Sequence, residues 1–134
     1  MSSRLGYVVV LGGLGVAISG CGGSGSSKQM LVKPAQVQRA FAHQGIPTFV
    51  ANFGPNTPMT TISPIQYADQ IEIYVFKKAA NAEAFFTLAT KQKPQPEIRR
   101  KGSAIILRSN VIIIFHKGQG AWRLSQAEGA ASAF

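Results

Sequence analysis

Cysteine is almost absent from this sequence of 134 residues, which contains only Cys21. Because a disulfide needs two cysteines, no covalent cross-link can form within the chain, although small exported domains often depend on them. Long hydrophobic runs are absent too: the uncharged stretch from Tyr7 to Ile18 is shorter than the ~20 apolar residues that cross a bilayer as a helix. A folded domain of this chain must therefore be stabilised by its own apolar core.

Acidic side chains are scarce, with five Asp and Glu against 14 Lys and Arg, for a net charge of +9. The titratable groups on which enzymes usually depend are few: Asp69, Glu72, Glu83, Glu97, Glu128, His43 and His116. None is spaced for metal ligation, no serine lies in a nucleophile-elbow pattern, and no glycine-rich loop opens a helix after a strand. The sequence therefore predicts no catalytic residues, no metal and no cofactor, although Asp69 and His116 could still meet in space.

The first 21 residues have the parts of a secretory signal. Arg4 supplies a positive charge, an apolar run follows, and small residues precede the cysteine. The segment Ile18-Ser19-Gly20-Cys21 resembles the lipobox of bacterial lipoproteins. The resemblance implies that the Cys21 thiol receives a diacylglycerol, that cleavage occurs before it, and that the new amino group is often acylated as well. Several chains suit this role, because one acyl chain anchors only marginally. An ordinary cleavable signal and an N-terminal membrane helix are the alternatives.

These features divide the chain into a signal peptide at 1–20, a lipidated cysteine with a Gly/Ser tether at 21–29, a single domain at 30–128 and a frayed tail at 129–134. The expected location is the extracytoplasmic face of the cell membrane, which the lipid on Cys21 would contact. Without Arg4 the processed chain keeps a net charge of +8. Nucleic acid is not an expected partner, since no binding motif is present and export would separate the two. Anionic lipid headgroups suit this charge better.

Turn residues and apolar spacing predict the first half of the domain. A helix is expected from Met30 to Gln44, with Pro34 in its first turn and Gly45 as a left-handed cap. A strand follows at Thr48–Phe53, where alternate residues are apolar. The next segment, Gly54–Pro64, contains three prolines and is expected to be a loop.

The second half begins with a clear strand at Gln70–Lys77. A helix capped by Asn81 and ended by Pro94 should follow, because its apolar residues recur at helical spacing. The segment Glu97–Lys101 is expected to be a solvated loop. Its basic run, Arg99, Arg100 and Lys101, is the expected contact with an anionic surface or an acidic partner.

Two β-rich runs, Ala104–Arg108 and Val111–Phe115, are separated only by Ser109 and Asn110, which predicts a tight hairpin with asparagine tolerating a positive φ. Pairing from this turn places Arg108 opposite Val111. Both faces of the hairpin are then apolar: one carries Ile105, Leu107, Ile112 and Ile114, and the other carries Ala104, Ile106, Val111, Ile113 and Phe115. Because a half-exposed sheet should alternate apolar and polar residues, something must cover each face.

The predicted architecture is an α+β fold of α-β-β-α-β-β order, with a four-stranded antiparallel sheet and both helices on one face. The second face would be covered by the tail, where Trp122, Leu124 and Ala127 are spaced for a short helix, by a second copy of the chain, or by a protein partner. This predicts a non-catalytic binding or accessory module of the cell envelope. The alternatives are an envelope structural or anionic-lipid-surface protein that acts through its charge, and a small enzyme.

Overall fold

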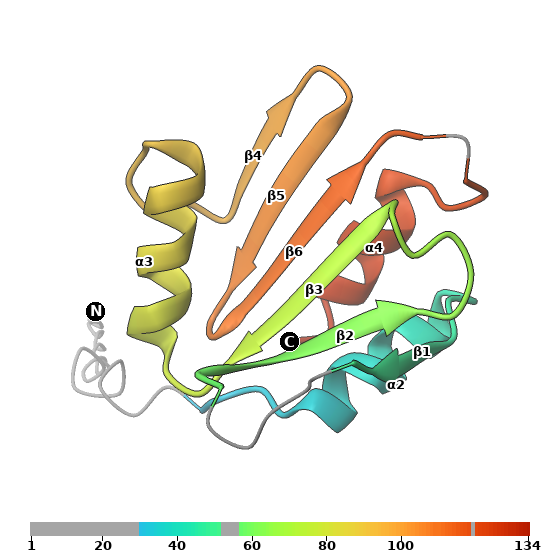
Figure 1. Cartoon of the computed structure of the whole chain (residues 1–134), viewed down its shortest axis with the longest axis horizontal. Coiled ribbons are helices and arrows are strands. Elements are labelled where there is room, and N and C mark those ends of the chain that lie inside the picture. Colours follow the sequence, from blue (N-terminus) through green and yellow to red (C-terminus); the bar gives the residue numbers. More distant parts are fainter. Residues whose placement is uncertain (1–29, 52–56, 119) are drawn as a thin grey trace, which may run out of the picture. The chain divides into compact units, whose positions relative to one another are not determined.

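Helices and strands alternate along the domain in the order α-β-β-β-α-β-β-β-α (Figure 1). The computed structural model describes residues 30–51, 57–118 and 120–134. Cys21 and the tether therefore lie outside the described residues, as does the end of the first predicted strand. The elements are α2 (Pro34–His43), β1 (Thr48–Val50), β2 (Met59–Pro64), β3 (Ile71–Phe76), α3 (Ala79–Thr90), β4 (Glu97–Arg100), β5 (Ser103–Arg108), β6 (Val111–His116) and α4 (Leu124–Ala131). None of the helices in these described ranges is long and apolar enough to cross a membrane.

The α+β class is confirmed, but the sheet has six strands rather than four, in the order β1-β2-β3-β6-β5-β4 with every pair antiparallel. The prediction of a loop up to Pro64 was wrong, because Thr60, Thr61 and Ile62 form the centre of β2 between flanking prolines. β-branched residues favour strands, and the proline lies at the strand's last position, where a lost donor matters least.

The prediction of a basic loop at Glu97–Lys101 was also wrong, since most of this segment is the edge strand β4. Its Ile98 pairs with Ile105 of β5, which gives the strand one apolar contact with the sheet. Charged residues on the rest of the strand are typical of a sheet edge, because they discourage pairing with another chain.

The β5–β6 hairpin was predicted with the correct register, in which Arg108 pairs with Val111 and Leu107 with Ile112. The turn residues have different roles from those expected. Ser109 adopts the positive φ, at 52°, while Asn110 is only 1% exposed and turns its side chain inward. A buried amide must find partners, and its partners organise this end of the domain.

The helices do not share one face, which corrects the predicted layering. Figure 1 shows α2 and α4 behind the sheet, where they pack on the face that contains Ile106, Ile113 and Phe115. Helix α3 covers the opposite face with Ala82 and Phe86. The reason is the doubly apolar hairpin, since each face needs a helical layer. Both faces of the hairpin are therefore covered within the chain, which removes the reason for expecting a second copy or a partner over one of them.

The helix ends show further differences from prediction. Pro34 begins α2 and Gly45 follows it with a φ of +79°, as expected. Helix α3 begins two residues before Asn81, with Lys78 as its N-cap, so the predicted cap lies inside the first turn. The tail predicted to fray at 129–134 instead contains the end of α4, whose Ala130 and Ala131 are buried.

Two buried side-chain amides lie at opposite ends of the central strands β3 and β6, and each binds the segment that leads into a helix. Asn110 accepts a bond from Val32 N–H (2.8 Å) and donates to the carbonyl oxygens of Val32 (2.9 Å) and Phe76 (2.7 Å). Gln70, which is 4% exposed, donates to Trp122 O at 2.6 Å and accepts from Trp122 N–H at 3.3 Å. Val32 lies two residues before α2 and Trp122 two residues before α4. We refer to these two places as the Asn110 end and the Gln70 end.

Candidate functional site

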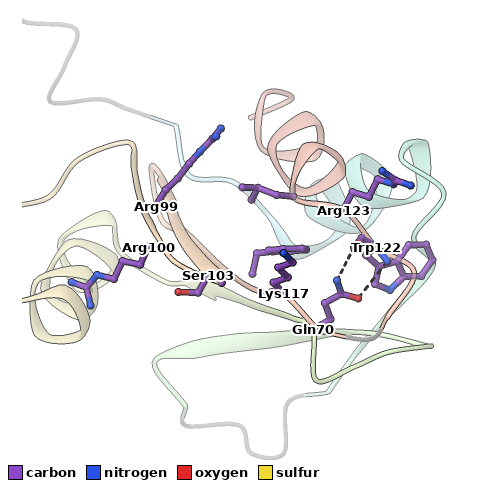
Figure 2. Close-up of a pocket in the computed structure, with 11 residues that line it drawn as sticks. Gln70, Arg99, Arg100, Ser103, Lys117, Trp122 and Arg123 are labelled. Carbon is purple, nitrogen blue, oxygen red and sulfur yellow. Dashed lines mark hydrogen bonds between the residues drawn. The ribbon is translucent and has the colours of Figure 1, made fainter.

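A cavity of about 380 Å³ lies at the Gln70 end, on the face of the sheet that α4 covers (Figure 2). Its wall combines the turn between β4 and β5, the end of β6 and the segment that leads into α4. The lining residues are Gln70, Arg99, Arg100, Gly102, Ser103, Phe115, Lys117, Gly118, Trp122, Arg123 and Leu124. Ligand cavities usually measure about 300–1,000 Å³, so this one can hold a small molecule.

A glycine turn and several hydrogen bonds fix the segments on the two sides of the cavity. Gly102 adopts a φ of +80° in the tight turn between β4 and β5, a conformation that glycine adopts without strain. Its carbonyl oxygen accepts a bond from Lys117 N–H at 2.7 Å, which fixes the segment after β6 beside that turn. On the other side the amide of Gln70 binds both backbone groups of Trp122, as the dashed lines in Figure 2 show.

The Trp122 side chain is fixed at both its polar and its apolar parts. Its Nε1–H donates to Gln66 O at 3.1 Å, and its ring meets Tyr67 edge-on with centroids 6.0 Å apart. A tryptophan held in this way presents a rigid apolar surface. With Phe115 and Leu124 it gives the cavity an apolar wall.

Two cations at this cavity remain unpaired with carboxylates among the described residues. Lys117 and Arg123 both line the cavity and are exposed, and the ion pairs of the described ranges include neither of them. Arg123 is the N-cap of α4, where its backbone N–H donates to Gln126 Oε1 at 2.8 Å. Its side chain is therefore not needed for capping. The cavity thus combines an apolar wall with uncommitted positive charge.

The three residues of the predicted basic contact, Arg99, Arg100 and Lys101, do not form one surface. Figure 2 shows Arg99 and Arg100 pointing to opposite sides of β4. Arg99 forms ion pairs with Glu97, at 2.6 Å, and with Glu128 of α4. Arg100 donates to Thr90 O at 3.0 Å and so contacts the end of α3. Lys101 is exposed in the adjoining turn. Two of the three residues proposed for a membrane or partner contact are therefore engaged within the domain.

A polar cluster lies on the opposite face of the sheet at the same end. His116 Nε2 lies 2.6 Å from Glu72 Oε2, and Tyr74 donates its hydroxyl proton to Glu72 Oε1 at 2.6 Å. Burial raises the pKa of Glu72, but the bonds to Tyr74 and His116 and the imidazolium charge outweigh burial and lower the pKa below its ordinary value of 4.5. Burial, with the neighbouring carboxylate, raises the pKa of Tyr74 to about 12. His116 thus meets a carboxylate, but the partner is Glu72 rather than Asp69.

Two residues with hydroxyl groups lie near this cluster. Thr90 and Ser103 line a cavity of about 140 Å³ together with His116. The Thr90 hydroxyl donates to Phe86 O at 2.8 Å. Ser103 lies opposite His116 in the pairing of β5 with β6, but among the described residues no side-chain hydrogen bond joins the two. Nor do three His, Cys, Asp or Glu side chains gather into a metal site anywhere in the described ranges.

The sequence analysis named Arg99 and Arg100, which do line the cavity at the Gln70 end, but it did not predict that Gln70, Lys117 and Trp122 would form a site with them. Gln70 is distant in sequence from Lys117 and Trp122, and the pairing of β3 with β6 brings them together. One signal was available, namely a lone tryptophan beside a basic residue just before a helical pattern. No protein-family model, no curated protein and no solved structure matches this chain.

Proposed function

We propose that this protein is a lipid-anchored extracytoplasmic lipoprotein whose domain is a non-catalytic binding module, with the cavity at the Gln70 end as its ligand site. The lipobox-like segment before Cys21 supports the anchor. The single observation that supports the binding role is the cavity of about 380 Å³, which has an apolar wall and a rigidly held tryptophan. Buried aromatic surface next to a few polar groups is what small-molecule sites usually offer.

The anchor and the ligand site are tested separately. Cys21→Ser should abolish lipid modification, so that mass spectrometry finds no acylated peptide and the protein leaves the membrane fraction. For the site, native mass spectrometry of the extracted protein should find a bound small molecule. Leu124→Trp, which fills the cavity, should remove it, while Leu88→Trp on the exposed surface of α3 should not. A wild-type protein that is never acylated would contradict the anchor, and equal ligand occupancy in both tryptophan variants would contradict the site.

A second candidate function, attachment to an anionic membrane surface, is supported by lysines at the Asn110 end. Asn110 binds the backbone of both Val32 and Phe76, and the residues that follow them, Lys33 and Lys77, therefore both belong to this end. Both are exposed, and the described part of the chain holds no carboxylate in an ion pair with either. Each lysine near anionic headgroups contributes about 1 kcal/mol.

Sedimentation with vesicles tests this second function. Wild-type protein should bind vesicles that contain phosphatidylglycerol more tightly than pure phosphatidylcholine vesicles. Reversing both charges in Lys33→Glu/Lys77→Glu should weaken the binding by about tenfold or more, while Lys101→Glu should have a smaller effect. Equal binding to the two kinds of vesicle would exclude a role for charge, and a larger loss in Lys101→Glu would return the contact to the β4–β5 turn.

A further inference from the structure

We infer that the ligand of the cavity at the Gln70 end is a single-chain anionic amphiphile, with its apolar part against Phe115, Trp122 and Leu124 and its carboxylate or phosphate at Lys117 and Arg123. This inference rests on the proposed binding function and names the class of molecule that the same site takes. It follows from the size of the cavity, from the chemistry of its wall and from the charges that remain unpaired there.

Size limits the ligand to one chain or one small ring system. The volume of about 380 Å³ is at the lower end of the range of ligand cavities. A phospholipid with two acyl chains would need considerably more space. The wall also favours an apolar chain over a sugar or a peptide, because Phe115, Trp122 and Leu124 line it, and the Gln70 amide already directs one N–H and its oxygen to the backbone of Trp122.

Charge determines which end group the ligand carries. Four cations line the cavity, but Arg99 pairs with Glu97 and Glu128, and Arg100 binds Thr90 O. Lys117 and Arg123 remain. Asp69 lines an adjoining hollow together with Lys117, yet the ion pairs of the described residues do not join them. An anionic group next to the apolar wall would complement these two cations.

The cavity contains its own reporter. Trp122 is the only tryptophan of the sequence and lines the cavity, so its fluorescence reports occupancy directly. The full chain with Cys21→Ser, which cannot accept lipid, is titrated with sodium dodecanoate below its critical micelle concentration. Dodecyl phosphate tests the other anionic group, and dodecanol tests the chain without charge. Acetate and inorganic phosphate test the anionic groups without a chain.

A matched pair of variants isolates the contribution of charge. Lys117→Glu/Arg123→Glu reverses the two cations of the cavity, and Lys78→Glu/Lys93→Glu makes the same change of charge at two exposed lysines on either side of α3. Dodecanoate and dodecyl phosphate should change the fluorescence of the parent chain and of the second variant alike. Their affinity for the first variant should be about tenfold to a hundredfold weaker. Acetate and phosphate should cause no change.

Each other outcome identifies which proposal fails. If dodecanol binds as well as dodecanoate and charge reversal has no effect, the preference for anions is wrong while the binding function stands. If acetate or phosphate alone competes fully, the site is an anion site without a role for the chain. If none of the dodecyl compounds changes the fluorescence of Trp122, the proposed ligand site fails together with this inference.

Discussion

Asn110 immediately precedes β6 and binds the backbone of Val32, while Gln70 immediately precedes β3 and binds the backbone of Trp122. These two ends of the central strand pair repeat each other in further detail. Phe76 N–H donates to Asn110 O at 2.8 Å, and His116 N–H donates to Gln70 O at 2.7 Å. The residues after them, Lys77 and Lys117, each donate to a carbonyl oxygen of a neighbouring turn or strand end, those of Pro58 and Gly102.

The helices that begin at these ends also share one type of N-cap hydrogen bond. Lys33 and Arg123 are the N-caps of α2 and α4, and each donates its backbone N–H at 2.8 Å to a glutamine side chain three residues later. The ends differ in the number of hydrogen bonds that the amide makes and in what surrounds it. Asn110 makes three side-chain hydrogen bonds at 1% exposure, whereas the longer Gln70 makes two beside the cavity. Similar bonding therefore forms a fully buried contact at one end and borders a cavity at the other.

The largest expected effect is that of Asn110→Ala. The substitution leaves Val32 N–H and the carbonyl oxygens of Val32 and Phe76 without their partner in a buried place. Unsatisfied buried groups cost about 1–3 kcal/mol each, and part of that cost is recovered by relaxation, so we expect the free energy of unfolding to fall by about 3 kcal/mol. Urea denaturation followed by circular dichroism measures this change.

Asn81→Ala is the matched control for that substitution, since it removes the same side chain from an exposed position in α3. Because α3 begins at Ala79, the control should leave the stability unchanged or raise it by about 0.5 kcal/mol, as alanine favours helices. A loss of about 1 kcal/mol would mean that Asn81 caps the helix. If Asn110→Ala cost no more than its control, the Asn110 end would not depend on this amide.

Gln70→Ala should have a smaller effect on stability and a larger one on the cavity. Two hydrogen bonds to Trp122 are lost next to a space that water can enter, so we expect a cost of about 1–2 kcal/mol. The released Trp122 should become more exposed, and its fluorescence should shift to the red, which the Asn110 variant should not cause below its unfolding transition. A cost equal to that of Asn110→Ala, with an unchanged emission spectrum, would remove the difference between the two ends.

The smallest effects concern the polar cluster of Glu72, Tyr74 and His116 on β3 and β6. At the Asn110 end, the strand positions that correspond to these three residues are apolar. The pKa of Glu72 is lowered on folding, so its contribution to stability is present above pH 4.5 and is lost as the pH falls through the folded value. The pKa of Tyr74 is raised to about 12, so the stability linked to it is present at neutral pH and is lost between about pH 10 and 12.

Glu72→Gln tests the cluster. The pKa of Tyr74 should fall partway toward its ordinary value, because burial still acts on the phenol while the carboxylate charge is gone. The ultraviolet absorbance of the phenolate measures this pKa, and Glu83→Gln on exposed α3 is the control. Since Glu72 is partly solvated, the stability should change by less than about 1 kcal/mol. A pKa of Tyr74 that rises in Glu72→Gln, or that matches free tyrosine in the parent chain, would contradict the observed bonds.

Local patterns predicted the elements whose signals lie within one segment. The β5–β6 register follows from two apolar runs and a two-residue turn, and α2 follows from Pro34 and Gly45. Strands β2 and β4 were missed because prolines in one and arginines in the other resemble loops, and only pairing with β3 and β5 makes them strands. The bonding role of Asn110 and the position of Gln70 beside Trp122 depend on partners that lie between 34 and 78 residues away, which no local pattern contains.

We propose that the ligand binds at the Gln70 end and not at the Asn110 end. Amide chemical-shift mapping by nuclear magnetic resonance, with dodecanoate added to the full chain carrying Cys21→Ser, tests this difference most directly. We expect shifts at Gly102, Ser103, Gly118 and Leu124, with Val32 and Lys77 unaffected. Shifts centred on Val32 and Lys77, or spread evenly over the domain, would contradict it.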